Sequence, residues 1–275
     1  MPELPEVEVS RQGIAPELEG RTILGATVRC ARLRLDLDPH LPDLLRGRLI
    51  RRVARRGKYL LLDCPGAADG GTLMIHLGMS GSLRFVPPET PPQTHDHFDL
   101  AVGDRLLRYR DPRRFGLIVW IPGTEPERHP LLAHLGPEPL DDGFTGRWLH
   151  AALRRRSQAI KPVLMDASLV VGVGNIYASE SLFRSGISPL RPANRIAAGR
   201  CDALAAAVKA TLADAIAAGG SSVRDYVHSD GGAGCFQISA AVYERAGEPC
   251  RRCGTPIRQI RQAGRSTYSC PRCQR

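Results

Sequence analysis

The spacing of hydrophobic residues changes near residue 20 of the chain. Residues 5 to 19 place four apolar side chains among charged neighbours: Val7, Val9, Ile14 and Leu18. This spacing predicts an amphipathic helix that ends near Gly20. From 22 to 121 the apolar residues instead form short runs separated by Gly, Pro and Asp. Such runs are typical of an antiparallel β-sandwich, and they predict strands at 22–30, 59–64, 72–77, 82–86, 97–102, 105–110 and 116–121.

Helical spacing returns in the second half of the chain. Short helices are predicted at 145–156 and 175–185. The clearest helix is predicted at 200–218, where an apolar residue recurs every four positions and two glycines follow as a stop signal: Leu204, Val208, Leu212, Ile216, then Gly219 and Gly220. Frequent Pro and Gly between the strand-rich part and the helical part of the chain predict an interdomain segment over 126–144.

Four of the eight cysteines crowd into residues 250–275 as two CxxC pairs separated by 16 residues: Cys250, Cys253, Cys270 and Cys273. This spacing matches a four-cysteine zinc ribbon, and it disfavours chance clustering or a redox pair. Four thiolate ligands leave no open position, so we expect one structural Zn²⁺. The expected class is therefore α+β: a sandwich domain flanked by helices (1–125), an interdomain segment (126–144), a helical domain (145–240) and a zinc finger (241–275).

Charge narrows the possible partners. Lys plus Arg number 38 against 28 acidic residues, a formal net charge of +10. Seven arginines and no acid lie in 250–275, and seven cations and no acid lie in 46–58, a distribution that favours a nucleic-acid partner over a merely solvated surface. The chain has no apolar run long enough for a membrane span, and its acidic N-terminus is unlike a secretory leader. We therefore expect no membrane partner and a cytoplasmic location.

Lysine is rare in this arginine-rich chain, and the three lysines are Lys58, Lys161 and Lys209. Arg and Lys are interchangeable as screened surface charges but not where a compact ammonium is needed. Lys58 and Lys161 are therefore candidates for a specific role. Lys209 lies within the regular helix predicted at 200–218, where a solvated role is the simpler interpretation.

The N-terminus offers a nucleophile. If Met1 is removed, Pro2 becomes a secondary amine beside the carboxylate of Glu3. Such an amine can attack a sugar C1′ and form an iminium. A free α-amino group has a reference pKa of about 7.7 to 8, so a useful neutral fraction exists near pH 7. The alternative is an ordinary helix start punctuated by proline.

Four runs and the cysteine motif make the sequence recognisable: PELPEVE at 2–8, HLGMSGSL at 76–83, DPRRFG at 111–116 and GVGNIYASE at 172–180. Together they resemble the bacterial formamidopyrimidine-DNA glycosylases, in family order and spacing over nearly the whole chain. The resemblance implies a bifunctional enzyme of base excision repair that removes 8-oxoguanine and formamidopyrimidines and then cleaves the abasic site by β- and δ-elimination. It also implies a helix-two-turn-helix element within the helical domain.

The resemblance implies a role for each matching residue. Pro2 would be the Schiff-base nucleophile, Glu3 the acid/base, and Lys58 and Arg265 further catalytic residues. DNA contacts would come from His76, Met79, His95, Arg113, Arg114, Phe115, Lys161 and Asn175. Within that set, Met79, Arg113 and Phe115 would fill the space left by the extruded nucleotide. Glu6 and Glu180 would lie near the lesion pocket.

The sequence also departs from the family pattern. The segment expected to cap the extruded base, residues 229–236, has Ala233 and Cys235 where Pro and Tyr would be expected. Lesion preference is therefore less closely specified than the chemistry. The alternatives are an endonuclease VIII-like glycosylase for oxidised pyrimidines and a non-catalytic zinc-ribbon DNA-binding protein. The expected partner is damaged double-stranded DNA, bound by a monomer. No nucleotide cofactor is expected, since the GVG at 172–174 lacks the third glycine of a dinucleotide-binding fingerprint.

Overall fold

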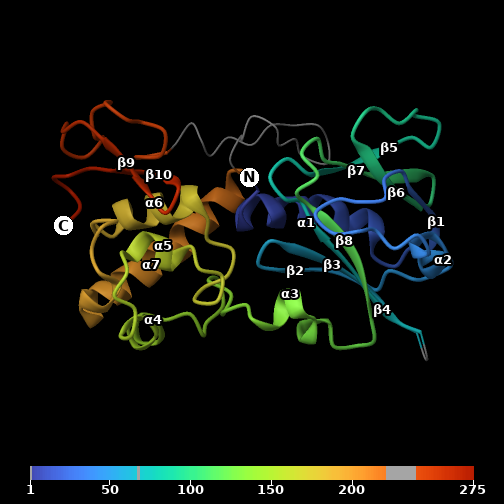
Figure 1. Cartoon of the computed structure of the whole chain (residues 1–275), viewed down its shortest axis with the longest axis horizontal. Helices are drawn as coiled ribbons and strands as arrows, with labels where there is room; N and C mark the ends of the chain where they lie inside the picture. Colours follow the sequence, from blue (N-terminus) through green and yellow to red (C-terminus); the bar gives the residue numbers. More distant parts are fainter. Residues whose placement is uncertain (1, 67–68, 221–239) are drawn as a thin grey trace. The chain divides into compact units, whose positions relative to one another are not determined.

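The computed structural model describes residues 2–66, 69–220 and 240–275. The chain divides into two compact units, Met1–Ala133 with Gly219–Cys235 and His134–Ala218 with Phe236–Arg275. Figure 1 colours the chain along its sequence. Within the described ranges, no helix combines the length and the apolar character needed to cross a bilayer.

The first unit contains two four-stranded antiparallel sheets. One has the order β1-β6-β7-β5, with β1 (Ile23–Val28), β6 (Asp96–Val102), β7 (Arg105–Arg110) and β5 (Ser82–Val86). The other has the order β2-β3-β4-β8, with β2 (Arg52–Arg56), β3 (Tyr59–Cys64), β4 (Gly71–His76) and β8 (Leu117–Pro122). Apolar side chains from both sheets form one buried cluster, which includes Leu60, Leu62, Leu73, Ile75, Phe98, Leu100 and Leu107. The predicted sandwich is thus confirmed.

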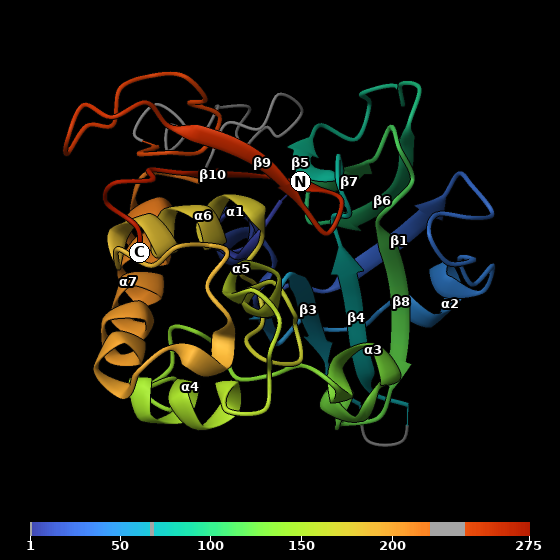
Figure 2. The same cartoon turned by 60° about the vertical axis from the view of Figure 1, so that its left-hand side comes forward.

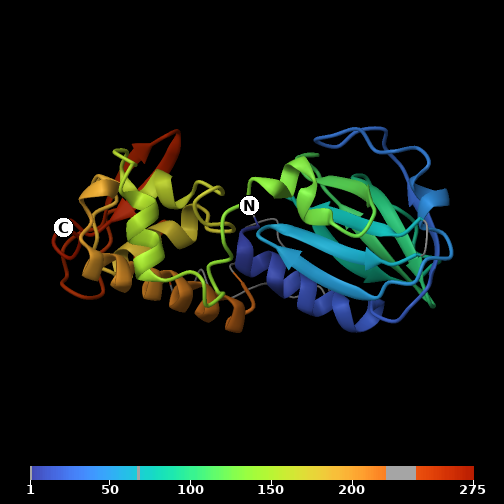
Figure 3. The ribbon, with the colours of Figure 1, turned by 90° about the horizontal axis from the view of Figure 1, so that it is seen from below.

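Helix α1 (Leu4–Leu18) packs against β2 and β3 and lies along the strands in Figure 3. Val7, Ile14 and Leu18 are fully buried, as the apolar spacing predicted. The helix begins with a capping box: the Glu3 side chain accepts from the backbone of Glu6, and the Glu6 side chain accepts from the backbone of Glu3. Two donors at the helix start are thereby satisfied. The unit also contains α2 (Leu41–Leu45), η1 (Pro126–Arg128) and α3 (Pro130–Ala133).

Strand β2 was not predicted from the hydrophobic pattern. Four of the residues over 51–56 are arginines, and only Val53 of the strand is buried. β2 lies at the edge of its sheet, where cationic side chains remain in solvent and protect the edge from further pairing. The segment was therefore interpreted only as a basic cluster, whereas it is also a strand.

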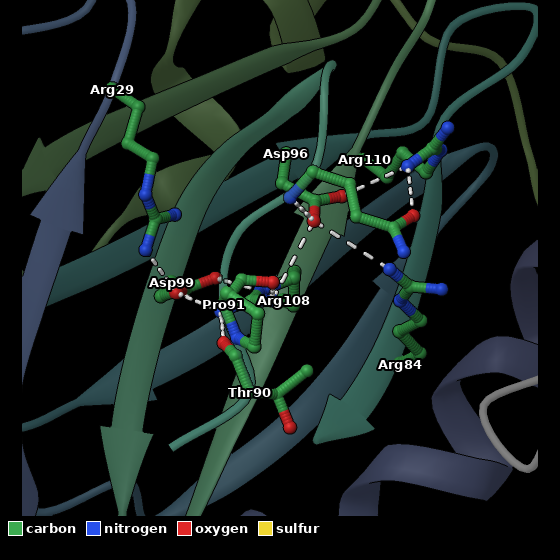
Figure 4. Close-up of polar contacts among 9 residues, drawn as sticks. Arg29, Arg84, Thr90, Pro91, Asp96, Asp99, Arg108 and Arg110 are labelled. Atoms are coloured by element: carbon green, nitrogen blue, oxygen red, sulfur yellow. Dashed lines mark hydrogen bonds and ion pairs between the residues drawn. The ribbon is translucent and has the colours of Figure 1, made fainter. Parts of the chain in front are cut away.

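The proline-rich loop between β5 and β6 is anchored by a buried ion network (Figure 4). Arg108 of β7 is 1% exposed and donates to both carboxylate oxygens of Asp99, each at 2.9 Å. The same guanidinium donates to the carbonyl oxygens of Thr90 and Pro91 at 3.0 and 3.1 Å. A strand residue thus fixes the backbone of the loop that leads to His95.

The second unit contains α4 (Gly146–Leu153), α5 (Ile160–Leu164), α6 (Asn175–Arg184), η2 (Ala193–Arg195) and α7 (Ala198–Ala217). Helix α7 packs against α4 and α6, and Figure 2 shows these helices together with the hairpin of β9 (Arg258–Gln262) and β10 (Arg265–Ser269). Leu204, Val208 and Leu212 are fully buried along one face of α7. The helices predicted at 145–156, 175–185 and 200–218 are confirmed with small shifts at their ends, and the whole has the predicted α+β class.

Candidate active site and nucleic-acid interface

The predicted nucleophile lies at the start of α1. Pro2 is buried and directly precedes Glu3, the N-cap of the helix. Glu3 and Glu6 are 2% and 0% exposed, and the Glu6 Oε2 accepts a 2.7 Å hydrogen bond from the Glu3 backbone nitrogen. Gly220 packs against Glu6, since a Cβ at Gly220 would lie 3.3 Å from the Glu6 Cγ. The capping box therefore fixes the backbone that carries both Pro2 and Glu3.

Lys58 lies in the tight turn between β2 and β3, and it is half-buried. Gly57, at φ +56°, and Lys58 form a two-residue connection of the kind that favours glycine. Arg55 Nη1 donates to the Gly57 carbonyl at 2.9 Å, while Arg55 Nε donates to Glu8 of α1, also at 2.9 Å. One guanidinium therefore connects α1 with the turn that carries Lys58.

Glu8 accepts from Arg11 as well as from Arg55. Burial alone would raise the pKa of Glu8, but the hydrogen bonds from Arg11 and Arg55 outweigh burial and lower it. The carboxylate thus stays ionised at neutral pH, and the connection between helix and turn is charge-assisted.

Sheet register brings three predicted site segments into one row. Tyr59, next to Lys58, pairs with His76 at the end of β4, and His76 pairs with Leu117 at the start of β8. The turn with Met79 follows His76, and the turn with Phe115 precedes Leu117. Residues separated by as many as 58 positions in the sequence, Tyr59 and Leu117, therefore lie at the same end of one sheet.

His76 has a defined tautomer. Its Nδ1 accepts a 2.9 Å hydrogen bond from the Gly78 backbone nitrogen, so the ring proton resides on Nε2. Burial, with contributions from Arg34 and Lys58, lowers the pKa of His76 to about 3. The imidazole is consequently a neutral donor at physiological pH, able to bind a phosphate or sugar oxygen through Nε2.

Met79 and Phe115 are large apolar side chains that remain exposed, at 36% and 45%. The guanidinium carbon of Arg113 lies 4.7 Å from the centroid of the Phe115 ring. Met79 lies on the turn between β4 and β5. A flexible thioether, a flat ring and a guanidinium are thus presented to solvent on two short turns.

Two other predicted contact residues have strained backbones. His95 has φ +76° and Arg114 has φ +54°, a left-handed conformation that is uncommon for residues other than glycine. Such strain is found at functional sites, where the surrounding structure enforces it. Here the Asp111 backbone nitrogen donates to the His95 carbonyl at 3.1 Å, and the Arg114 nitrogen donates to the Asp111 carbonyl at 3.2 Å.

In the second unit, Asn175 is the first residue of α6 and is half-buried. The start of a helix presents unpaired backbone N–H groups that favour an anion. Lys161 donates to Asn175 Oδ1 at 2.6 Å, to the Ser266 carbonyl at 2.8 Å and to Thr267 Oγ1 at 2.7 Å. Lys161 is 1% exposed, so a direct contact with a phosphate would require its ammonium to give up one of these bonds.

Glu180 also makes internal contacts. Its carboxylate accepts hydrogen bonds of 2.8 to 2.9 Å from the backbone nitrogens of Ala241, Val242 and Tyr243. It therefore fixes the chain where the described segment 240–275 begins. The predicted capping segment at 229–236, with Ala233 and Cys235, lies outside the described residues, as does Met1.

Arg265 is exposed and begins strand β10. Gln262 pairs with Arg265 across a two-residue turn of Ala263 and Gly264, both with positive φ. Such turns match the twist of a hairpin and close it tightly. Arg265 thus extends from the tip of the hairpin, while Lys161 holds the same strand from within the unit.

The four predicted metal ligands come together beside this hairpin. The sulfur atoms of Cys250, Cys253, Cys270 and Cys273 all lie within 4.8 Å of one another. Tetrahedral Zn–S bonds of about 2.3 Å place sulfur atoms about 3.8 Å apart, and the Cys250–Cys273 and Cys253–Cys270 separations are 3.9 and 3.5 Å. The geometry and the thiolate chemistry both fit one structural zinc.

Glu8, Arg55 and Asp111 support the site, but no signal in the sequence marks them as supports. Glu8 and Arg55 are ordinary members of a helix and of a basic cluster until the fold pairs them. Asp111 belongs to the recognised DPRRFG run, but its position within the run does not reveal what it contacts.

Comparison with protein families gives three matches in chain order. Residues 1–118 match the formamidopyrimidine-DNA glycosylase N-terminal domain, residues 135–227 match the formamidopyrimidine-DNA glycosylase H2TH domain, and residues 247–275 match the zinc finger found in FPG and IleRS. Each match covers a part of the chain in which a predicted motif lies.

Relatives extend these matches over full lengths. The formamidopyrimidine-DNA glycosylases of Dechloromonas aromatica and Ralstonia nicotianae are 62% and 57% identical to this chain, over 100% of both sequences in each case. Among solved structures, a Lactococcus lactis FPG mutant in complex with Fapy-dG-containing DNA has a TM-score of 0.92 at 35% identity over 100% of both chains. The MutM (FPG) protein of Thermus thermophilus has a TM-score of 0.87 at 38% identity over 99% of this chain and 98% of that one.

Proposed function

Because this chain belongs to the formamidopyrimidine-DNA glycosylase family, we propose that it excises oxidised purines from double-stranded DNA through covalent catalysis by Pro2. Its family makes it a DNA glycosylase and AP lyase of base excision repair. The substrates expected first are formamidopyrimidines and 8-oxoguanine. The observation that carries the mechanism is the buried Pro2–Glu3 pair at the capped start of α1.

The proposed reaction begins once Met1 has been removed. The Pro2 nitrogen forms a bond to C1′ while the bond from C1′ to the base breaks, and the base leaves with that electron pair. The positive end of α1 lies at this nitrogen and favours the unprotonated, nucleophilic amine. Glu3 takes up the proton that the Pro2 nitrogen loses after the attack and delivers it to the deoxyribose ring oxygen, so that the C1′–O4′ bond breaks, the ring opens and an iminium remains at C1′. Loss of a C2′ proton then breaks the C3′–O3′ bond and expels the 3′ phosphate, and loss of a C4′ proton breaks the C5′–O5′ bond and expels the 5′ phosphate.

Lys58 and Arg265 complete the proposed catalytic set. The ammonium of Lys58 stabilises negative charge near the reacting sugar and phosphate. Its turn is connected to α1 through Arg55 and Glu8, so the nucleophile and the cation share one support. Arg265 binds phosphate from the hairpin tip.

Contacts with the phosphate backbone are assigned to His76, His95, Arg114 and Asn175. The neutral Nε2 donor of His76 and the start of α6 support two of these assignments. For Lys161 we propose support of Asn175 and the hairpin as its route to DNA binding, because its ammonium is occupied internally.

Extraction of a base from duplex DNA leaves a hole that the enzyme must fill. The exposure of Met79 and Phe115, together with Arg113 beside the ring, supports their assignment as the residues that enter the helix. Glu6 is proposed to border the lesion pocket, and Glu180 contributes by anchoring the chain after the capping segment. We retain the division into a catalytic domain (1–125), a connecting segment (126–144), an H2TH domain (145–240) and a zinc finger (241–275), acting on the bacterial nucleoid in the cytoplasm.

A second substrate class has a specific observation in its favour. The wild-type Lactococcus lactis Fpg has been crystallised with DNA containing an oxidised pyrimidine, and that protein has a TM-score of 0.91 against this chain. Cleavage of matched duplexes carrying 8-oxoguanine, an oxidised pyrimidine or no lesion separates the proposals. We expect fastest cleavage at 8-oxoguanine opposite cytosine. Faster cleavage at the pyrimidine would favour the endonuclease VIII-like alternative, and no cleavage of any duplex would favour a DNA-binding protein without catalysis.

A further inference from the structure

Three predicted DNA-contacting segments of the first unit meet at one buried carboxylate. Asp111 is 0% exposed and directly follows β7. Its Oδ1 accepts a 2.7 Å hydrogen bond from the Ser80 hydroxyl, which lies on the turn of Met79. Its Oδ2 accepts 2.8 Å from the Gly116 backbone nitrogen, at the end of the turn that carries Arg113 and Phe115.

Both carboxylate oxygens and the backbone of Asp111 make further hydrogen bonds in the same region. Oδ1 also accepts from the Arg113 nitrogen at 3.3 Å, and Oδ2 from the Tyr109 hydroxyl at 3.2 Å. The backbone nitrogen donates to the His95 carbonyl at 3.1 Å, and the carbonyl lies 3.0 Å from His97 Nε2. The turn of Met79, the segment of His95 and the turn of Arg113 and Phe115 are thus all bonded to one residue.

The chemistry of a carboxylate explains why this residue type is needed. In the described part of the chain, Asp111 forms no ion pair, so its burial is not compensated by a partner cation. Burying such a group is costly unless it is hydrogen-bonded. A carboxylate alone among side chains can accept from four donors without offering any. The four hydrogen bonds that Asp111 accepts therefore offset the cost of burying its carboxylate, and they fix the positions of the four donor groups.

The two turns also touch through their backbones. A Cβ on Gly78, which has φ +65°, would collide with the Phe115 carbonyl carbon and the Gly116 nitrogen. A Cβ on Gly116 would collide with the His76 carbonyl and the Tyr109 hydroxyl. Close backbone contact and the Ser80–Asp111–Gly116 bonds hold the two turns against each other.

We propose that Asp111, acting through Ser80, is a positioning residue for base extrusion: it holds the turn of Met79 and the turn of Arg113 and Phe115 in the single arrangement that enters the DNA helix. This inference rests on the proposed function. Asp111 is buried and touches no substrate, so it acts only through the residues that it holds.

Extrusion and lyase chemistry can be separated by the choice of substrate. Extruding a paired, stacked 8-oxoguanine requires the inserted side chains, whereas an abasic nucleotide has no base to unpair or unstack and is extruded at little cost. Loss of the Asp111 bonds should therefore slow excision at 8-oxoguanine far more than cleavage at a preformed abasic site. A residue needed only for folding would slow both reactions to the same extent.

The test compares Ser80→Ala and Asp111→Asn in the full-length protein. Ser80→Ala removes the two hydrogen bonds of the Ser80 hydroxyl, the one that it donates to Asp111 Oδ1 and the one that it accepts from the Arg113 backbone nitrogen. Asp111→Asn places an amide donor against a backbone or hydroxyl donor. Asp104→Asn, an exposed acid on the β6–β7 turn, is the matched control. Single-turnover rates are measured on an 8-oxoguanine:cytosine duplex and on an abasic-site duplex, with 2-aminopurine beside the lesion to report unstacking.

We expect both variants to slow excision and the 2-aminopurine signal about 10- to 100-fold, the effect of a displacement near 1 Å in an aligned site. Cleavage of the abasic duplex should stay within roughly threefold of wild type, and Asp104→Asn should match wild type on both. Equal losses on both duplexes, or no loss with Ser80→Ala, would overturn the proposal. Wild-type protein inactive on both duplexes would instead contradict the proposed function.

Discussion

Lys161 donates a 2.6 Å hydrogen bond to Asn175 Oδ1 from a position that is 1% exposed. The same ammonium donates to two oxygens of β10, so it joins the start of α6 to the zinc-associated hairpin. A compact ammonium with three donors satisfies this set, whereas the planar fork of an arginine would not. This geometry explains why an arginine-rich chain has a lysine at this position.

We predict that Lys161→Met lowers the free energy of unfolding by about 1 to 3 kcal/mol, because three acceptors lose their buried donor. Affinity for an abasic-site duplex should fall as Asn175 and the hairpin lose their support. Urea unfolding and fluorescence anisotropy measure the two effects. Lys209→Met is the control, since Lys209 is half-buried and donates to the Asp141 carbonyl. Equal effects of the two substitutions would contradict the assignment.

Zinc removal should abolish tight DNA binding. The metal supplies folding free energy to small cysteine-bound modules, and Arg265 begins the hairpin beside the site. Chelation or Cys270→Ser should weaken binding of an abasic duplex at least about tenfold, and added Zn²⁺ should restore the chelated wild type. Cys201→Ser, a buried position outside the cluster, should bind as wild type does. Unchanged affinity after zinc loss would exclude a role for the finger in binding.

His76 should stay neutral throughout the physiological range. Its pKa is lowered to about 3 in the folded protein, against about 6.5 when unfolded, so the unfolded state binds more protons between these values. Stability should therefore fall as the pH drops from 6.5 towards 3, by up to about 1.4 kcal/mol per pH unit from this group. His76→Gln should flatten that slope. An NMR titration of the imidazole with a midpoint near 6.5 would show that the ring is not held as described.

The network of Arg108 provides a test of what fixes the proline-rich loop (Figure 4). Arg108→Met leaves Asp99 buried and short of one partner, with a predicted loss of about 3 to 5 kcal/mol in unfolding free energy. Asp99→Asn added to Arg108→Met should recover part of that loss, because the buried charge that Arg29 alone would have to compensate is gone. A double-mutant cycle in urea gives the coupling energy. A coupling energy near zero would mean that the ion pair does not hold the loop.

The sequence predicted those elements that are identified by residues close to one another along the chain. The period of α7 and the CxxC spacing are of this kind, since both depend on residues within a few turns of one another. Strands β2 and β9 were not predicted because arginines occupy their exposed faces. Both are edge strands with little apolar burial, so the usual alternation is absent.

Roles that depend on tertiary contacts could be predicted only in part. The rarity of lysine pointed to Lys161, but not to its burial beneath Asn175. The DPRRFG run pointed to Arg113 and Phe115, while Asp111 in the same run acquires its function only when Ser80 is brought to it by the fold. Such connections join residues 14 to more than 100 positions apart, which no local pattern records.

Trapping of the covalent intermediate tests the central claim most directly. Borohydride should reduce the proposed iminium and join the protein to a duplex carrying 8-oxoguanine opposite cytosine, with the attachment at Pro2 identified by mass spectrometry. Purified active enzyme should begin at Pro2, and Pro2→Gly should trap far less DNA while still binding an abasic duplex. Active enzyme that retains Met1, or an adduct at any other residue, would contradict the account.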